Sequence, residues 1–357
     1  MNPMLVTGAS GFFGGVLKRR LLAEGHTVVN LDLLPDPDGA QPDLTSLQGD
    51  IRDTALLDRL FREHRFAGVV HCAAKLAHDT VSDDDLWSSN VDGTRNIAQA
   101  CLDHGVPVLV NISTNCLWAH NVGHAIAEDE PPAPVELYGR SKLEAEHALE
   151  PFGTQFPVIT IRCPTIIDEG RLGLLAILFE FIEDGKRVWV VGDGGNRYQF
   201  IYAQDLATAC LQALNHRQTE LFHIGADDVV SLREVYEAVI RDSLNAAGQT
   251  STRKRRARVA QLPKAPTLAA MKLAHKLKIS PLGPYHYRMI AEDFLFDTTR
   301  IRERLGWRPT LSNADMMVRA FRYYSSRRAD IHARADTASA HSKAAPMGII
   351  RLLKWLS

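Results

Sequence analysis

Three glycines near the start of the chain place the strongest constraint on its fold. Gly8, Gly11 and Gly14 stand in the sequence TGASGFFG, which follows an apolar segment typical of a buried strand (3–7) and precedes apolar residues at helical spacing (13–24). The first glycine permits a tight turn, the second lets the backbone approach a phosphate group, and the third allows the helix to pack closely on the strand. The sequence therefore predicts a strand, a phosphate-binding turn and a helix whose amino end faces the phosphates.

Strand-like and helix-like segments alternate from this unit up to residue 163. Such alternation predicts an α/β fold, a doubly wound parallel sheet of the Rossmann type. Further strands are expected at 26–32, up to Asp50, and at 67–74, 106–114 and 157–163, and further helices at 53–64, 90–104 and 138–149.

Beyond the sixth strand the pattern is less regular and predicts a smaller, mixed α/β C-terminal region that closes over the carboxyl edge of the sheet. We expect a dinucleotide-binding domain over residues 1–165, with a returning segment at about 198–225. The substrate-binding region is expected to comprise 166–197 and 226–326. The remaining residues, 327–357, are expected to form a flexible tail that ends in an amphipathic helix.

The composition is that of an ordinary globular protein, and it excludes several classes of function. The 357 residues carry a formal net charge of -1, so no overall positive charge attracts nucleic acid. The five cysteines are dispersed without a CxxC pair, which indicates reduced thiols, a cytoplasmic location and no metal site. The first residues lack the basic segment of a signal peptide, and no apolar run reaches the roughly 20 residues of a membrane-spanning helix.

A carboxylate stands where the ribose of a dinucleotide would lie. Asp32 ends the second predicted strand, 18 residues after Gly14. There it can accept a hydrogen bond from the ribose 2′-hydroxyl, and it would repel a 2′-phosphate, so the cofactor is predicted to be NAD rather than NADP. Further cofactor contacts are expected from the glycine turn and from the ends of the third and fourth strands: Ser10, Phe12, Phe13, Asp50, Ile51, Ala73, Ala74 and Lys75.

The sequence YGRSK contains the candidate for the reacting group. Tyr138 and Lys142 are four residues apart in a predicted helix and so share one of its faces. A free phenol titrates at about 10, and an adjacent ammonium or nicotinamide cation is expected to lower its pKa. Tyr138 can then exchange a proton with a hydroxyl or a ketone, while Lys142 is also placed to hold the nicotinamide ribose. Thr114, at the carboxyl end of the fifth strand, can hydrogen-bond the reacting oxygen, and Ser113 is the competing candidate for that role.

These residues resemble the extended short-chain dehydrogenase/reductase family, in its NAD-dependent epimerase/dehydratase group. The resemblance covers residues 4 to 325 or so and implies a Rossmann domain interleaved with a smaller substrate domain. It is carried by TGASGFFG (7–14), Asp32, GDIRD (49–53), HCAAK (71–75), NVDGTRN (90–96), ISTNCLW (112–118), YGRSK (138–142), RCPTII (162–167), FIYAQDLA (200–207) and FDTTRIRERLGWRP (296–309).

The same resemblance implies residue roles. It makes Tyr138 the general base, Lys142 its partner and Thr114 the hydroxyl that assists, and it implies a homodimer. Cofactor contacts by Asn90, Tyr138, Lys142, Cys163 and Pro164 are added to those above. The implied substrate contacts are Lys75, Thr114, Asn115, Cys116, Tyr138 and Arg197.

Departures from the family's patterns bear on the reaction. Asn115 and Cys116 follow Thr114 where nucleotide-sugar 4,6-dehydratases carry Asp-Glu, so an acid for hydroxide departure is missing and dehydration is disfavoured. Residues 162–165 (RCPT) replace an R-Y-F-N stretch whose Asn contacts the diphosphate in many nucleotide-sugar epimerases. Arg197 lies one place from the family's diphosphate-binding arginine. RCPTII and SPLGPYHYRM also resemble the branch of the family that acts on 3β-hydroxysteroids.

The leading hypothesis is an NAD-dependent epimerase that acts on a secondary hydroxyl of a nucleotide-activated sugar through a transient ketone. The alternative is an NAD-dependent dehydrogenase or reductase of a hydroxysteroid-like or lipid alcohol, which a less polar wall formed by Cys116 and Trp118 would favour. A third hypothesis, a non-catalytic NAD-binding sensor or scaffold, is opposed by the complete set of Thr114, Tyr138 and Lys142. Polar candidates for the pocket are His120, Asn121, Arg197, Tyr285, His286 and Arg288.

Two segments have no place in this scheme. The basic run TRKRRAR (252–258) predicts a solvated face, or a contact with phosphate or acidic lipid. The last residues, GIIRLLKWLS, form an amphipathic pattern that predicts docking on the protein's own surface or on a dimer partner, or peripheral contact with a membrane.

Overall fold

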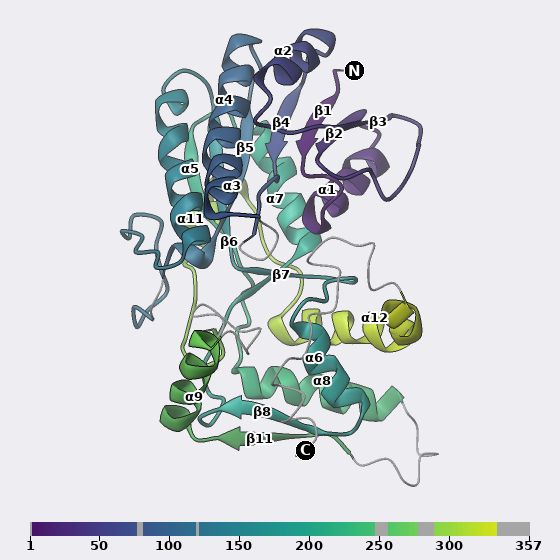
Figure 1. Ribbon diagram of the computed structural model, residues 1–357, viewed down its shortest axis with the longest axis vertical. Coiled ribbons are helices and arrows are strands. Elements are labelled where there is room, and N and C mark those ends of the chain that lie inside the picture. Colours follow the sequence, from purple (N-terminus) through teal and green to yellow (C-terminus); the bar gives the residue numbers. More distant parts are fainter. Residues whose placement is uncertain (1, 77–80, 119–120, 247–255, 278–288, 334–357) are drawn as a thin grey trace.

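A seven-stranded parallel sheet forms the centre of the N-terminal lobe (Figure 1). The computed structural model describes residues 2–76, 81–118, 121–246, 256–277 and 289–333. The strand order is β10-β6-β5-β4-β1-β2-β3, which reverses between β1 and β4, the place where ligands bind in sheets of this kind. The predicted doubly wound Rossmann sheet is confirmed. Its strands are β1 (Met4–Thr7), β2 (Val28–Asp32), β3 (Leu44–Gln48), β4 (Gly68–His71), β5 (Leu109–Thr114), β6 (Val158–Cys163) and β10 (Glu220–His223).

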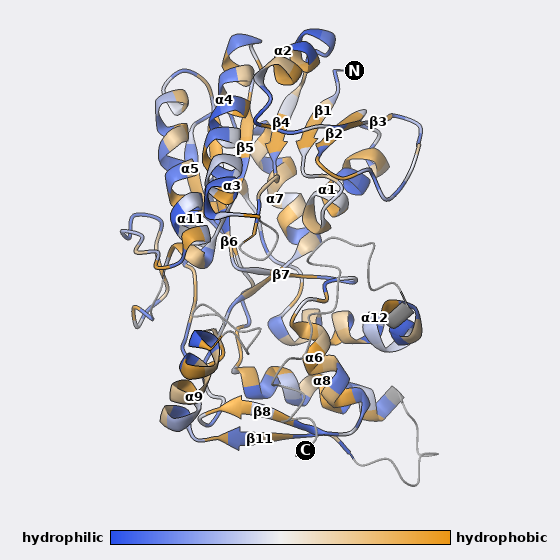
Figure 2. Cartoon of the chain, viewed as in Figure 1, coloured by the Kyte–Doolittle hydropathy of each residue, from blue (hydrophilic) through white to orange (hydrophobic). Residues whose placement is uncertain are grey.

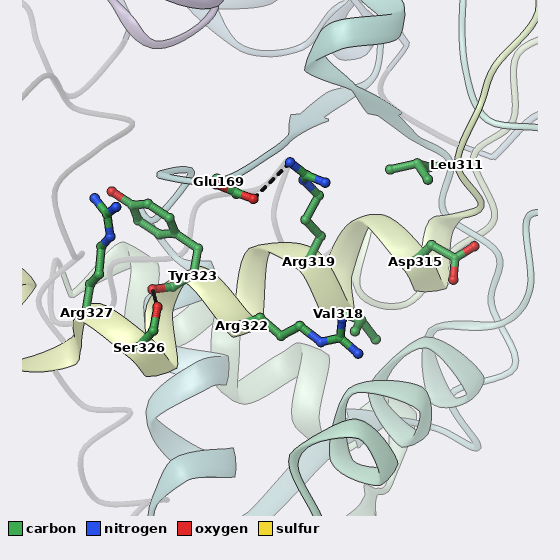
Figure 3. A pocket seen from close by; sticks show the side chains of 9 residues that line it. All are labelled: Glu169, Leu311, Asp315, Val318, Arg319, Arg322, Tyr323, Ser326 and Arg327. Carbon is green, nitrogen blue, oxygen red and sulfur yellow. Dashed lines mark hydrogen bonds and ion pairs between the residues drawn. The ribbon is translucent and has the colours of Figure 1, made fainter. Parts of the chain in front are cut away.

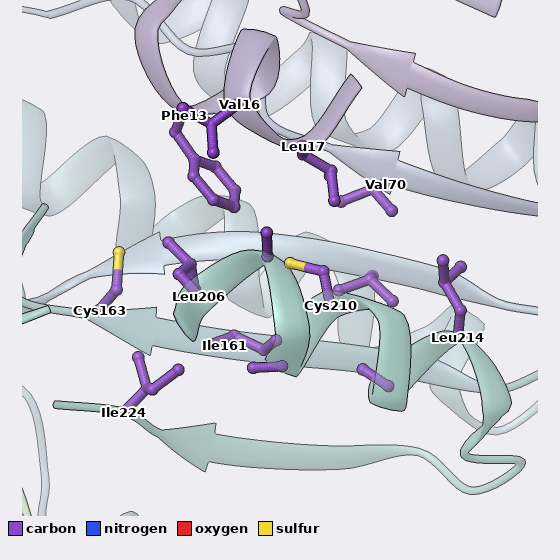
Figure 4. Packing of buried hydrophobic residues seen from close by; sticks show 14 of the residues in the cluster. Phe13, Val16, Leu17, Val70, Ile161, Cys163, Leu206, Cys210, Leu214 and Ile224 are labelled. Atoms are coloured by element: carbon purple, nitrogen blue, oxygen red, sulfur yellow. The ribbon is translucent and has the colours of Figure 1, made fainter. Parts of the chain in front are cut away.

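Helices cover both faces of this sheet, because each carries one apolar face. On one side, α1 (Phe12–Ala23) and α7 (Ala203–Asn215) share a hydrophobic layer with the strands, and Figure 4 shows Leu17 and Leu206 within it. Both leucines are fully buried, which stabilises the fold by about 2 kcal/mol each. The other side is covered by α2 (Thr54–Glu63), α4 (Gly93–Asp103) and α5 (Leu137–Gly153).

The local predictions for this lobe need two corrections. The third strand ends at Gln48, so Asp50 lies in the turn that follows it and not at its end. The helix expected at 90–104 is longer and irregular: it begins as α3 (Asp83–Trp87), passes through a π-helical turn η1 (Ser88–Asp92) and continues as α4. Asn90 lies within the π turn, a feature that is often found at functional sites.

The C-terminal lobe has a hydrophobic core of its own below the sheet (Figures 1 and 2). Its centre includes Phe179, Tyr198, Phe321 and Tyr324, and strand β8 of this lobe is apolar along most of its length (Figure 2). Short parallel strand pairs, β7 with β9 and β8 with β11, border this core. The elements are β7 (Thr165–Ile167), α6 (Leu175–Glu183), β8 (Arg187–Val191), β9 (Phe200–Tyr202), α8 (Leu232–Ala246), β11 (Arg258–Leu262), α9 (Lys264–Lys276), α11 (Thr299–Leu305) and α12 (Asn313–Ala333).

The flexible tail was expected to begin at residue 327, but α12 continues to Ala333. Residues 327–333 are therefore helical. One face of α12 is buried in the C-terminal core, and Arg328 extends from that side to pair with the buried Glu180 and with Asp184 at the end of α6, at 2.7 and 2.8 Å. The rest of the tail lies outside the described residues, as do His120, Tyr285, His286 and Arg288.

The basic run at 252–258 is described only from residue 256 onward. Arg256 and Arg258 are exposed, and Arg258 begins strand β11, which fits the prediction of a solvated face for this part of the run. Within the described ranges, no helix is both long enough and apolar enough to cross a membrane.

A buried histidine connects the first strand to the helices behind the sheet. His71 accepts at Nδ1 from the Thr7 hydroxyl (2.7 Å), while its Nε2 lies 3.0 Å from the hydroxyl oxygen of Thr94. Because Thr94 donates to the carbonyl of Asn90 (2.6 Å), its oxygen must accept, so the histidine proton is on Nε2. Burial, followed by the charge of Lys142, lowers the pKa of His71 to about 3. The imidazole is therefore neutral in the folded protein near neutral pH.

This lowered pKa predicts acid sensitivity. The unfolded chain takes up a proton on this histidine near pH 6.5 and the folded chain only near pH 3, so stability is full above 6.5 and falls as the pH drops through this window. When the pH is lowered from about 7 to 5.5, the unfolding free energy of both proteins should fall. The fall should be about 1 kcal/mol smaller in His71→Gln than in the original protein, because the variant has no histidine to protonate at this position. Urea unfolding at both pH values tests this, with the exposed His147→Gln as the control. Equal pH dependence in all three proteins would contradict the assignment.

Candidate functional site

The glycine turn at the carboxyl end of β1 leaves room for a phosphate group. Gly8 has φ +75°, and a β-carbon there would lie 2.7 Å from the amide nitrogen of Ala73. A β-carbon on Gly14 would clash with the carbonyl oxygen of Gly8. Gly11 is the N-cap of α1 and brings no side chain to its first amides, so these point to the turn. The turn and helix dipole together fit the pyrophosphate of a dinucleotide.

Asp32 lies directly beside this turn. Its carboxylate accepts from the amides of Ser10 and Leu34, both at 2.9 Å. Burial raises the pKa of Asp32, and the backbone hydrogen bonds oppose that shift. The Ser10 hydroxyl is itself occupied, since it donates to the carbonyl of Leu34 at 3.1 Å. The carboxylate is thereby held next to the phosphate-binding turn, as a contact with the ribose requires.

The other predicted cofactor residues on this side of the sheet are held by side-chain pairs. Asp50 is bound by Arg52, which lowers its pKa, and Arg52 also pairs with Asp85 at 2.9 Å. The ammonium of Lys75 pairs with the same Asp85 at 2.5 Å. Both cations are thus tied to the start of α3. Ile51 is buried, and Ala73 donates its amide to Thr7 (3.3 Å).

Asn90 joins the cofactor side of the site to the helix that carries Tyr138. Its side-chain oxygen accepts from the Lys75 amide (2.7 Å), and its amide group donates to the Lys75 carbonyl and to the Ser141 hydroxyl, both at 3.0 Å. All three bonds are made by one buried amide. The segment after β4, which includes Ala74, is therefore held at a fixed position relative to α5.

Helix α5 and strand β5 bring the three predicted catalytic residues together. The ammonium of Lys142 is buried and donates to the carbonyl of Ile112 on β5 at 2.8 Å. Thr114, the last residue of β5, hydrogen-bonds Tyr138 and opposes the rise in its pKa. Ser113 points elsewhere, because its hydroxyl donates to Glu146. This geometry favours Thr114 over Ser113 as the partner of Tyr138.

The pKa of Tyr138 differs from the prediction. It was expected to be lowered by Lys142, but it is raised well above the ordinary value, mainly by burial. The charge of Arg171 acts in the opposite direction. Burial also lowers the pKa of Lys142, which weakens its effect as a cation. Desolvation of the whole pair therefore outweighs the attraction that the spacing suggested.

Close backbone contact sets the position of α5. A β-carbon on Gly139 would clash with the carbonyl oxygen of Cys116, so the first turn of α5 lies against the 3-10 turn η2 (Asn115–Leu117). Thr114 caps that turn by accepting from the Cys116 amide at 3.1 Å. The Cys163 thiol, at the end of β6, donates to the carbonyl of Ser113 (3.2 Å), and its pKa is raised by burial to about 12. Pro164 follows it directly.

The structure separates two residues that were predicted to contact the substrate. Asn115 is buried and donates to the hydroxyl of Tyr198 at 2.6 Å, and that hydroxyl lies 3.3 Å from the hydroxyl of Thr165. Arg197 instead faces outward, with its side chain half exposed and paired with Asp293 at 3.3 Å. Neighbours in an extended segment point to opposite sides, so Tyr198 takes the inward position next to Arg197. The substrate contact expected of Arg197 stays a prediction.

Trp118 is also misplaced by the sequence prediction. Its side chain is buried against Phe296 and under the guanidinium of Arg162, 5.1 Å from the ring centroid. It therefore packs in the core and does not form an apolar wall beside Thr114. Among the described residues, no cluster of three or more His, Cys, Asp or Glu side chains could hold a metal ion.

Comparison with known proteins finds relatives along most of the chain. Residues 4–225 match the model of the NAD dependent epimerase/dehydratase family. The chain is 32% identical over 337 residues to the uncharacterized protein y4nG of Sinorhizobium fredii, covering 93% of this chain and 81% of that one. It is 31% identical over 261 residues to a UDP-glucose 4-epimerase of Halalkalibacterium halodurans, with 66% and 78% covered. The crystal structure of the Thermotoga maritima UDP-glucose 4-epimerase with UDP-glucose has the same fold, with a TM-score of 0.72 at 21% identity and 91% and 99% coverage.

The two adjacent glycines of α1 provide a matched test of the phosphate turn. Gly14→Ala places a methyl group against the backbone of Gly8, which cannot move aside, and NAD affinity should fall by at least about tenfold. Gly15→Ala meets the mobile end of Arg19 at 3.4 Å and the carbonyl oxygen of Ala9 at 3.5 Å, both ordinary contact distances, and should bind NAD normally. Calorimetric titration of NAD into protein from which bound cofactor has been removed measures both. Equal affinities in the two variants would place the cofactor phosphates elsewhere.

Asp32 should determine the choice between dinucleotides. Asp32→Asn removes the negative charge that repels a 2′-phosphate, so the ratio of NADP to NAD affinity should rise by about tenfold or more. Titrating each dinucleotide into both proteins checks this, and Asp103→Asn at the end of α4 controls for a loss of charge. If the original protein binds NADP more tightly than NAD, the assigned role of Asp32 is wrong.

Proposed function

The chain belongs to the NAD dependent epimerase/dehydratase family, and we propose that it is an epimerase of a nucleotide-activated sugar. The reaction would invert a secondary hydroxyl through a transient ketone. The observation that carries the proposal is the group of Thr114, Tyr138 and Lys142, with uncharged residues following Thr114. Its relatives include UDP-glucose 4-epimerases, which supports the substrate class.

Tyr138 accepts the proton of the sugar hydroxyl in this proposal. Thr114 hydrogen-bonds the same oxygen. Lys142 follows Tyr138 by one turn of α5, and its ammonium is held by the carbonyl of Ile112. NAD held by the glycine turn and Asp32 would supply a hydride acceptor for the carbinol carbon and a hydride donor for the opposite face of the ketone. The proton on Tyr138 goes back to the oxygen, so the enzyme ends each cycle unchanged. Such internal redox requires the cofactor to stay bound.

The neutral residues after Thr114 favour epimerisation over dehydration. Loss of water from a sugar needs an acid that donates a proton to the departing hydroxide. Asn115 cannot provide one, and its amide is already engaged with Tyr198. Cys116 stands at the next position. Neither side chain is a carboxylic acid. Reduction of the ketone intermediate back to an alcohol is therefore favoured over the loss of water.

The alternative is a dehydrogenase or reductase of a hydroxysteroid-like or lipid alcohol. One of the two residues that favoured it, Trp118, does not line the site. Trp118 was expected to make the pocket less polar, but it packs against Phe296 and Arg162. Cys116 remains beside Thr114 as an element of lower polarity. The homodimer, the cytoplasmic location and membrane contact by the tail stay predictions.

The first experiment combines cofactor content with turnover. The purified protein should retain nearly stoichiometric NAD and should interconvert UDP-glucose and UDP-galactose without net formation of NADH. Tyr138→Phe should lower kcat by about 1000-fold while NAD is still retained, because only the proton acceptor is lost. Tyr236→Phe on α8, outside the site, controls for the loss of a phenol.

Two results would contradict the proposal. Cofactor-free protein that forms NADH only with an added alcohol would favour the dehydrogenase, and steroid-like and lipid alcohols would then be screened. A normal kcat in Tyr138→Phe would remove Tyr138 from the reaction whatever the substrate.

A further inference from the structure

Arg171 brings a cation from the C-terminal lobe to the cofactor side of the site. It lies in the loop between β7 and α6, and its guanidinium carbon is 5.8 Å from the ring centroid of Phe12, the first residue of α1. The same charge acts on Tyr138 and on Cys163. Arg171 thus lies at the amino end of α1, and its charge acts in the direction that lowers the pKa of the predicted base.

The loop that carries Arg171 is held in place by contacts with α12. Arg319 of α12 pairs with Glu169 at 2.9 Å and approaches Asp168 at 3.6 Å. Figure 3 shows the contact with Glu169, beside a hollow of about 650 Å³ on the outer side of α12. The next residue after Arg171 is Leu172, which is buried in the C-terminal core. The loop is therefore anchored on both sides of Arg171 by the C-terminal lobe.

Two glycines allow the chain to turn around this position. Gly170 has φ +84° and Gly173 has φ +50°, conformations that other residues rarely adopt. Arg171 and Leu172 lie between them, and Leu172 points into the lobe. The side chain of Arg171 is therefore directed toward Phe12 by a turn that the sequence is built to form.

The chemistry of this position is that of a phosphate site with two walls. The amides and dipole of α1 attract an oxyanion, and α1 has twelve residues, long enough for a strong dipole effect. A guanidinium binds phosphate in a planar, two-pronged geometry. Arg197, the cation predicted for this role, is paired with Asp293 on the surface, and its inward neighbour is the uncharged Tyr198. Arg171, in contrast, lies beside the amino end of α1.

We propose that Arg171 binds the diphosphate group of a ligand in the cleft and thereby joins the C-terminal lobe to the phosphate-binding turn. The ligand class rests on the proposed function, since a diphosphate is present both in NAD and in a nucleotide sugar. The contact with Phe12 places the cation next to the turn. The two sources are distinguished by separate binding measurements.

The test uses Arg171→Gln and Arg171→Lys in the full chain, with Arg197→Gln as the control of equal charge change. If the cofactor is the ligand, Arg171→Gln should bind NAD about tenfold more weakly and bind UDP normally when saturated with NAD. If the substrate is the ligand, UDP affinity should fall about tenfold while NAD and uridine, which has no phosphate, are unaffected. Arg171→Lys should recover part of either loss.

Several outcomes separate this inference from the proposed function. Normal NAD and UDP affinities in a folded Arg171→Gln protein, as in Arg197→Gln, would overturn it. Equal losses in Arg171→Gln and Arg197→Gln would also overturn it, because they would reflect overall charge. If UDP does not bind the original protein, the nucleotide-sugar proposal fails, and the NAD titration alone decides the role of Arg171. An unchanged unfolding temperature shows that each variant is folded.

Discussion

The close contact between Gly14 and the carbonyl of Gly8 is the constraint on which the rest of the structure depends. It lets the amino end of α1 rest on the end of β1, so the first amides of the helix open onto the turn. The glycine turn also lies against the segment that follows β4, so closely that a β-carbon on Gly8 would clash with Ala73. Without these two approaches, α1 would stand away from the sheet. Asp32 and the segment after β4 would then lose their common neighbour.

A second set of contacts fixes how α5 is rotated about its axis. Gly139 lies against the Cys116 carbonyl, Lys142 reaches the Ile112 carbonyl, and Glu146 binds Arg162 of β6 at 2.6 Å. These three residues follow one another along the face of α5 that meets β5 and β6. The Glu146–Arg162 pair is buried, so its formation offsets a large desolvation cost and breaking one partner would leave an uncompensated charge. Tyr138, at the start of the same helix, is positioned by all three.

The sequence predicts the parts of this site that are local in the chain. The glycine turn, Asp32 and the YGRSK helix each depend on residues within one strand and one helix, and spacing alone places them. Trp118 was misjudged because the direction of its side chain depends on which side of its segment meets the core. Arg171 carried no signal, since its neighbour Phe12 is far away in the sequence. The end of α12 was missed because its buried face, around Phe321 and Tyr324, lies among residues rich in charge.

The raised pKa of Tyr138 opposes its proposed role as proton acceptor, because that role requires the phenolate and burial favours the protonated phenol. A buried phenol with a normal pKa would lose its proton to water at alkaline pH, whereas here desolvation keeps the proton in place. The same low polarity strengthens every charge that approaches, so a cation near the oxygen changes the pKa more than it would in water. Arg171 is such a cation, and it comes from the other lobe. Proton transfer by Tyr138 therefore depends on the two lobes lying together over the ligand, which ties the chemistry to binding.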